Sequence, residues 1–190
     1  MKPAQIVTSY SGWLDVLPAK AEQCLRDYQR RQIAELAQKM RLYLWILLQA
    51  PTGAGKTHII AAIILAAVAA EMRVLVLATR TRLVRQIHER LDAFGVPHGV
   101  IAAPLPELRN FNALVQVASV DTLYRRAIVS GKIPLPPADL GIFDEAHLAM
   151  ADTRLQVIES YPDVPWLGFT ATPARKSGRS LGCNDNDKLQ

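Results

Sequence analysis

A glycine-rich segment between two apolar stretches constrains the fold of this chain more than any other feature. Residues 50–57 read APTGAGKT, after an expected strand at 44–49 and at the start of an expected helix at 56–70. Gly53 and Gly55 allow the backbone to curl with its N–H groups inward, and the helix start adds the positive end of its dipole. This order predicts a phosphate-binding loop, or P-loop, over a glycine turn that only joins a strand to a helix.

The residues of this loop predict ATP and Mg²⁺ as ligands. Lys56 is expected to reach the β and γ phosphates as a mobile point charge, and the Thr57 hydroxyl is expected to coordinate Mg²⁺. The loop residues before them are expected to surround the phosphates. These residues are Pro51, Thr52, Gly53, Ala54 and Gly55.

Short apolar runs alternate with helical patterns from residue 44 onward, which predicts βαβ units, a mostly parallel sheet and an α/β fold class. Three prolines between residues 133 and 139 predict an exposed loop. The expected strands are 44–49, 73–77, 98–102, 114–118, 140–143 and 166–169. The expected helices are 27–41, 56–70, 82–94, 121–129 and 153–160.

Two carboxylates follow the expected strand at 140–143. Residues 140–147 read LGIFDEAH, which places Asp144 and Glu145 at the carboxyl end of that strand, where open α/β sheets bind ligands. Asp144 is expected to hold Mg²⁺, and Glu145 to orient and deprotonate the attacking water. A solvated acidic turn is the competing interpretation, and the P-loop upstream disfavours it. His147 lies close enough along the chain to sense the γ-phosphate.

Composition limits the partners and the setting. The chain has 190 residues, half of them hydrophobic, which predicts one globular domain. A net charge of +5 suits a polyanionic partner such as nucleic acid. The two cysteines, Cys24 and Cys183, have no CxxC pair or histidine cluster nearby, so neither a disulfide framework nor a zinc site is expected. With no secretory signal and no bilayer-spanning apolar run, we expect a cytoplasmic protein without a membrane partner.

Three motifs in order give the chain a family resemblance. Residues 50–57, residues 144–147 (DEAH) and the triplet Thr170, Ala171 and Thr172 resemble motifs I, II and III of superfamily 2 helicases. The resemblance implies a three-layer, RecA-like P-loop NTPase domain of the DEAH-box type. It also implies that the triplet couples hydrolysis to movement and that His147 serves the catalytic site.

Looser matches extend the resemblance outward. Residues 25–29 (LRDYQ) resemble the segment that recognises adenine, with Arg26 and Gln29 as its nucleotide contacts. Residues 78–83 and 118–123 resemble nucleic-acid-binding motifs. Their Arg80, Ser119 and Thr122 are expected to contact phosphate oxygens without reading bases. A merely solvated basic helix face is the alternative, since Arg82, Arg85 and Arg90 lie near.

The resemblance covers roughly residues 25–181, and residues 170–175 (TATPAR) and 178–182 (GRSLG) resemble the RadD and restriction-helicase branch. We therefore expect an N-terminal extension at 1–24, the ATP-binding domain at 25–175 and a polar tail at 176–190 that stops before a second RecA-like domain. The implied partners are nucleic acid, DNA in preference to RNA, and that second domain, supplied in cis or in trans. Alone, the domain is expected to hydrolyse ATP weakly. A nucleotide- or DNA-binding fragment without turnover is the alternative, and a P-loop kinase or ABC-type ATPase ranks last.

Overall fold

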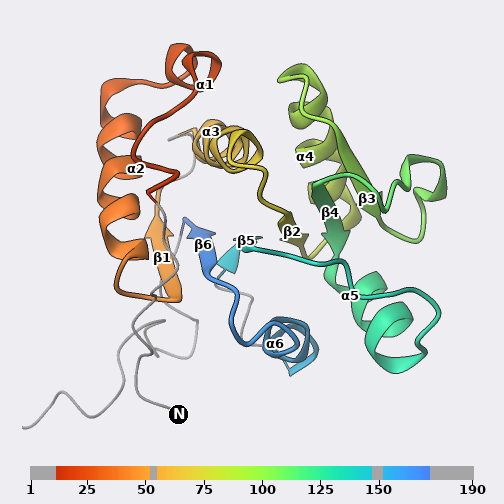
Figure 1. Ribbon diagram of the computed structural model, residues 1–190. Helices are drawn as coiled ribbons and strands as arrows, with labels where there is room; N and C mark the ends of the chain where they lie inside the picture. The colour runs from red at the N-terminus through yellow and green to blue at the C-terminus, as the bar shows by residue number, and fades with distance from the viewer. Residues whose placement is uncertain (1–11, 52–54, 147–151, 172–190) are drawn as a thin grey trace, which may run out of the picture.

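Parallel strands form the centre of the molecule (Figure 1). The computed structural model describes residues 12–51, 55–146 and 152–171. The strands follow the order β1-β6-β5-β2-β4-β3, and every neighbouring pair is parallel. The predicted α/β class with a mostly parallel sheet is confirmed, and the sheet is wholly parallel. The strands are β1 (Trp45–Gln49), β2 (Val74–Ala78), β3 (His98–Ile101), β4 (Val115–Ser119), β5 (Leu140–Asp144) and β6 (Trp166–Thr170).

Helices cover both faces of the sheet, so the domain has the predicted three layers. In Figure 1, α1 to α4 lie on one side of the strands, while α5 and α6 lie on the other. The first group comprises α1 (Ala19–Gln23), α2 (Asp27–Met40), α3 (Lys56–Ala69) and α4 (Thr81–Ala93). The second comprises α5 (Val120–Leu123), a π-helical continuation η2 (Tyr124–Val129) and α6 (Asp152–Glu159). A 3₁₀ turn, η1 (Pro106–Leu108), follows β3.

Each face of the sheet has its own hydrophobic core, because side chains alternate along a strand. In β2, Val74, Val76 and Ala78 pack in the core beneath α1 to α4. Leu75 and Leu77 pack in the opposite core with residues of α5 and α6. All five side chains are buried. This two-sided burial explains why the strands read as continuous apolar runs.

Two helical segments differ from their predictions. α1 was not expected, yet its Ala21 is buried and belongs to the core that also includes Leu14. Residues 12–24 thus contribute to the domain, and the boundary expected at residue 25 stays a prediction. The helix expected over 121–129 is a single α-turn followed by a π-helix, which Ser130 N–H ends by donating to the Arg125 carbonyl at 3.1 Å.

The expected proline-rich loop at 133–139 is confirmed as irregular backbone, and contacts fix both of its halves. The Tyr161 hydroxyl donates to the Pro136 carbonyl at 2.8 Å, and burial raises the pKa of Tyr161. At the end of the loop, Asp139 accepts two side-chain hydrogen bonds from Arg73, which lower the pKa of that carboxyl. The loop therefore has a defined path from the π-helix into β5.

The apolar stretch from residue 59 to residue 70 lies within α3 and its C-terminal cap, and much of it is buried against the sheet. Across the described part of the chain, no helix combines the length and the apolar character that crossing a bilayer requires.

Candidate nucleotide site

Three strands bring the predicted motifs to one edge of the sheet. β6 lies between β1 and β5, with Gln49 opposite Thr170 and Phe169 opposite Asp144. The Ala50 N–H donates to the Thr170 carbonyl at 2.9 Å. The residue before the predicted P-loop, the first residue of the predicted coupling triplet and the first carboxylate therefore occupy adjacent strand ends.

Gly55 closes the loop onto α3 in a conformation that favours glycine. Its φ of 70° is left-handed, and it is the residue that precedes the first turn of α3. The Gly55 carbonyl accepts a hydrogen bond of 3.3 Å from Nε2 of the buried Gln29, whose Oε1 accepts the Arg26 N–H at 2.9 Å. A Cβ at position 55 would lie 2.4 Å from Gln29 Nε2. The start of α2 is thus bound to the loop through the predicted adenine-site residue.

Lys56 and Glu145 face each other across the site. Lys56 Nζ lies 3.6 Å from Glu145 Oε1, and the side chains are only 15% and 30% exposed. A partly buried ion pair of this kind keeps both charges at the strand edge, although each partner is desolvated. The structure therefore brings together the two side chains expected to act on the terminal phosphate.

Glu145 has a strained backbone. Its φ is 57°, a left-handed conformation that costs a residue with a side chain about 1–2 kcal/mol. The Glu145 N–H donates to Asp144 Oδ1 at 3.0 Å, which supports the turn at the end of β5. Such strain persists where the surrounding structure fixes it, and it is common at functional sites. Here the left-handed residue turns the chain directly after Asp144, the last residue of β5.

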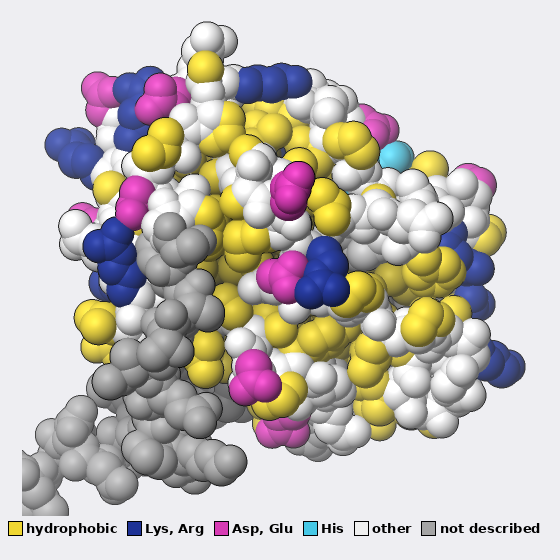
Figure 2. All heavy atoms as spheres, in the orientation of Figure 1, with side chains coloured by type: hydrophobic (Ala, Val, Ile, Leu, Met, Phe, Trp, Pro, Cys, Tyr) yellow, Lys and Arg dark blue, Asp and Glu magenta, His cyan; other side chains and the backbone are white. Residues whose placement is uncertain are grey.

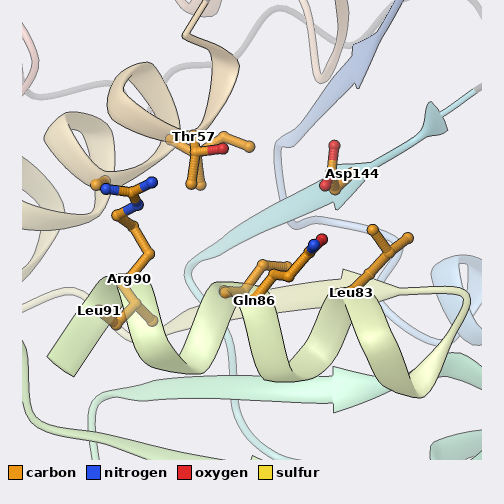
Figure 3. Close-up of a pocket in the computed structure, with 9 residues that line it drawn as sticks. Thr57, Leu83, Gln86, Arg90, Leu91 and Asp144 are labelled. Carbon is orange, nitrogen blue, oxygen red and sulfur yellow. The ribbon is translucent and has the colours of Figure 1, made fainter. Parts of the chain in front are cut away.

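Thr57 and Asp144 line one small cavity, which Figure 3 shows between α3, the end of β5 and α4. The cavity volume is about 40 Å³, enough for an ion with a water ligand. A hydroxyl and a carboxylate are the oxygen donors that Mg²⁺ prefers, so the residues fit this ion. Sequence analysis considered Arg90 only as part of a solvated basic face and did not single out Gln86, yet the side chains of both α4 residues point toward this space in Figure 3. Their i, i+4 spacing was the available signal.

The comparison with known families decides the identity. Residues 22–175 match the family described as "Type III restriction enzyme, res subunit". The chain belongs to this family. The resemblance to the restriction-helicase branch of superfamily 2 is therefore confirmed, and this res-family domain has the family and fold of ATP-dependent helicases.

Individual relatives agree with the family. The res-family domain is 35% identical over 132 residues to a 51.5 kDa protein of Lactococcus phage (isolate 7-9), with 70% of this chain and 25% of that protein aligned. The Pyrococcus furiosus Hef helicase domain has a TM-score of 0.64 at 23% identity, covering 85% of this chain and 36% of its own. A hypothetical ATP-dependent RNA helicase from Sulfolobus tokodaii has a TM-score of 0.62 at 22% identity, covering 82% and 51%. This domain thus spans a quarter to a half of these proteins.

The expected nucleic-acid contacts of the res-family domain differ in accessibility. Arg80 is exposed just before α4, whereas Ser119 and Thr122 are 7% and 9% exposed. The Thr122 hydroxyl already accepts the Ala103 N–H at 3.1 Å. On the face shown in Figure 2, basic side chains alternate with acidic and hydrophobic ones. The roles of Arg80, Ser119 and Thr122 stay predictions.

Several predicted residues of the res-family domain lie outside the described residues. They are Thr52, Gly53, Ala54, His147 and Thr172. Of their neighbours, Pro51 is exposed, Thr170 is fully buried at the end of β6, and Ala171 is half-buried.

Proposed function

We propose that this domain binds ATP with Mg²⁺ and the nucleic-acid backbone, as the first motor domain of a nucleic-acid-dependent ATPase of the helicase type. The observation that carries the proposal is the meeting of Lys56, Thr57, Asp144 and Glu145 at one sheet edge. These four residues come from two segments nearly ninety positions apart in the chain, at the ends of β1 and β5. Their side chains match the charges that a nucleotide triphosphate requires.

Each residue has a distinct role in the proposed site. The Thr57 hydroxyl and the Asp144 carboxylate would hold Mg²⁺, which supplies positive charge to the phosphates when bound. Lys56 binds the terminal phosphates as a point charge. Glu145 accepts a proton from the attacking water, and its turn conformation directs it away from the strand. Arg26 and Gln29 bind the adenine base. The loop residues 51–55 surround the phosphates.

Before nucleotide binds, the ammonium group of Lys56 is paired with the carboxylate of Glu145. At 3.6 Å the contact is longer than a tight ion pair, so phosphate oxygens compete for the ammonium group at modest cost. When phosphate takes the place of Glu145 at Lys56, the Glu145 carboxylate accepts a hydrogen bond from the attacking water. The pair thus connects phosphate binding with readiness of the general base.

The adenine side of the site gives the first prediction. Gly55→Ala is expected to weaken ATP binding about tenfold, because its Cβ displaces the Gln29 amide that lies 2.4 Å from that position. A double-mutant cycle separates this effect from backbone strain. In a Gln29→Ala background the same glycine substitution should cost less affinity. Equal losses in both backgrounds, measured by ATP titration, would show that Gln29 does not transmit the effect.

Nucleic-acid binding gives the second prediction and tests the proposed function. Single-stranded DNA is expected to stimulate ATP hydrolysis, and Arg80→Ala to weaken its binding by about 1 kcal/mol regardless of sequence. Arg85→Ala, at an exposed position within α4, is the matched control and should bind as the wild type does. Parallel titrations with double-stranded DNA and RNA identify the preferred substrate, for which we propose DNA. The control protein includes the second domain. If no nucleic acid changed its rate of ATP hydrolysis, the motor assignment would be contradicted.

A further inference from the structure

Two histidines and an aspartate form a cluster away from the nucleotide site. His88 and Asp92 are one turn apart on α4, and His98 begins the edge strand β3. Their i, i+4 spacing places His88 and Asp92 on one face of α4. The cavity that this cluster lines differs in all its described lining residues from the cavity at Thr57 and Asp144. The cluster is therefore a separate feature of the described chain.

His98 is held in a single tautomer. Its Nδ1 lies 2.7 Å from the Val96 carbonyl, to which it donates, and its side chain is only 3% exposed. Since Nδ1 carries the proton, Nε2 presents a lone pair to the cluster. A backbone carbonyl that accepts the distal N–H of a histidine is a common arrangement around metal ligands, because it fixes the ring and makes it more basic.

The three side chains lie close together. His98 Nε2 lies 2.7 Å from His88 Nδ1, whereas Asp92 lies beside the other nitrogen of each ring, with Oδ2 3.5 Å from His88 Nε2 and Oδ1 3.9 Å from His98 Nδ1. One donor atom from each residue falls within 4.8 Å of the other two. The backbone around them is fixed as well, because Val96 N–H donates to the Leu91 carbonyl at 2.9 Å across the left-handed Gly95. Placing three ligands around one ion therefore requires a small separation of the rings and a rotation of the Asp92 side chain, with the backbone unchanged.

We infer that His88, Asp92 and His98 bind a divalent transition-metal ion of the zinc type. Two imidazoles and a carboxylate suit Zn²⁺ or Co²⁺, whereas Mg²⁺ prefers oxygen ligands alone. The ion replaces the proton between the rings, and that proton is released to water. The distance between His88 Nδ1 and His98 Nε2 then increases from 2.7 Å to about 3.3 Å, as tetrahedral geometry requires. The largely exposed Asp92 carboxylate rotates to complete the protein ligands, and the adjoining cavity of about 440 Å³ admits a water as the fourth.

A bound ion would fasten the C-terminal half of α4 to β3. The described contacts between these elements include the hydrogen bond between the histidines, the Asp92–His98 contact at 3.9 Å and apolar contacts of the core. An ion that binds the folded state alone stabilises it in proportion to its occupancy. The site would thus be structural, and the cysteine-based reasoning from sequence did not find it because its ligands are imidazoles and a carboxylate.

The test is a titration of chelator-treated protein with Co²⁺ and then Zn²⁺, in Mg²⁺-containing buffer without nucleotide. We expect one ion per chain, visible absorption typical of four-coordinate Co²⁺, and a Zn²⁺-dependent rise in melting temperature. His88→Gln and Asp92→Asn should each weaken binding about tenfold or more. His58→Gln and Cys24→Ser, which alter a histidine and the exposed thiol elsewhere, should bind as the wild type does.

Asp92→Asn keeps the inference falsifiable if a histidine variant fails to fold, because Asp92 is 61% exposed. Wild-type protein without Co²⁺ absorption and without a Zn²⁺-dependent thermal shift would overturn the inference. So would binding that survives both His88→Gln and Asp92→Asn unchanged. In either case the two rings would serve only as a packing and hydrogen-bonding contact between α4 and β3.

Discussion

Joining a second RecA-like domain to this chain is expected to raise ATP turnover by about 10³- to 10⁵-fold. Enzymes with a P-loop gain that factor from an arginine that stabilises charge on the transferring phosphoryl group. The chain spans only 25% of its phage relative, so the unmatched part of that protein is the first place to look for a domain to fuse. The measurement is steady-state ATP hydrolysis by the isolated chain and by the fusion, with saturating nucleic acid.

Arg90 is an alternative source of the positive charge that the second domain is predicted to supply. It lines the cavity with Thr57 and Asp144, so it is a candidate for supplying the missing charge from within the domain. If it does so, the isolated chain will turn over as fast as the fusion, and Arg90→Ala will abolish the rate of both. That result would contradict the need for a second domain. A fusion carrying Glu145→Gln controls for contaminating ATPases.

Glu145→Gln is expected to lower the hydrolysis rate of the fusion about 10²- to 10⁴-fold while ATP binding is retained. The amide keeps the shape of the side chain but cannot accept the proton of the attacking water. It also removes the negative partner of Lys56, whose Nζ lies 3.6 Å away, so ATP affinity should stay equal or rise. Single-turnover hydrolysis and equilibrium ATP titration measure the two quantities separately.

A matched control for Glu145→Gln is Glu159→Gln, at the last residue of α6 and outside the nucleotide site. It should leave the hydrolysis rate unchanged. The assignment of Glu145 as the general base would be wrong if its glutamine variant hydrolysed ATP at the wild-type rate. A parallel loss of ATP binding and hydrolysis would instead indicate that Glu145 holds the loop in place.

Much of the fold could be predicted because its determinants are local. Strands buried on both faces read as apolar runs, and the P-loop lies within eight consecutive residues, 50–57. The strand before the DEAH segment also reads as an apolar run, so the segment could be placed at its carboxyl end. The structure adds the order of the strands in the sheet. β6 lies between β1 and β5, which brings Thr170 beside Ala50.

The features that sequence analysis missed depend on tertiary contacts. α1 is a short helix that gains its stability from burial of Ala21, and the π-helix after α5 departs from an ordinary helical pattern without a glycine or proline to mark it. Burial of Ser119 and Thr122 depends on their neighbours in space rather than on their motif. The left-handed turn at Glu145 has no local signal either, because glutamate rarely adopts it.

The most direct test of the central claim is equilibrium binding of ATP with and without Mg²⁺ to the wild type, Lys56→Ala and Lys20→Ala. We predict Mg²⁺-dependent binding by the wild type and by Lys20→Ala, whose lysine lies on α1. Lys56→Ala should lose about 10- to 100-fold in affinity, because a charged hydrogen bond to phosphate is removed. Binding that is unchanged by Lys56→Ala and independent of Mg²⁺ would contradict a nucleotide site at this edge of the sheet.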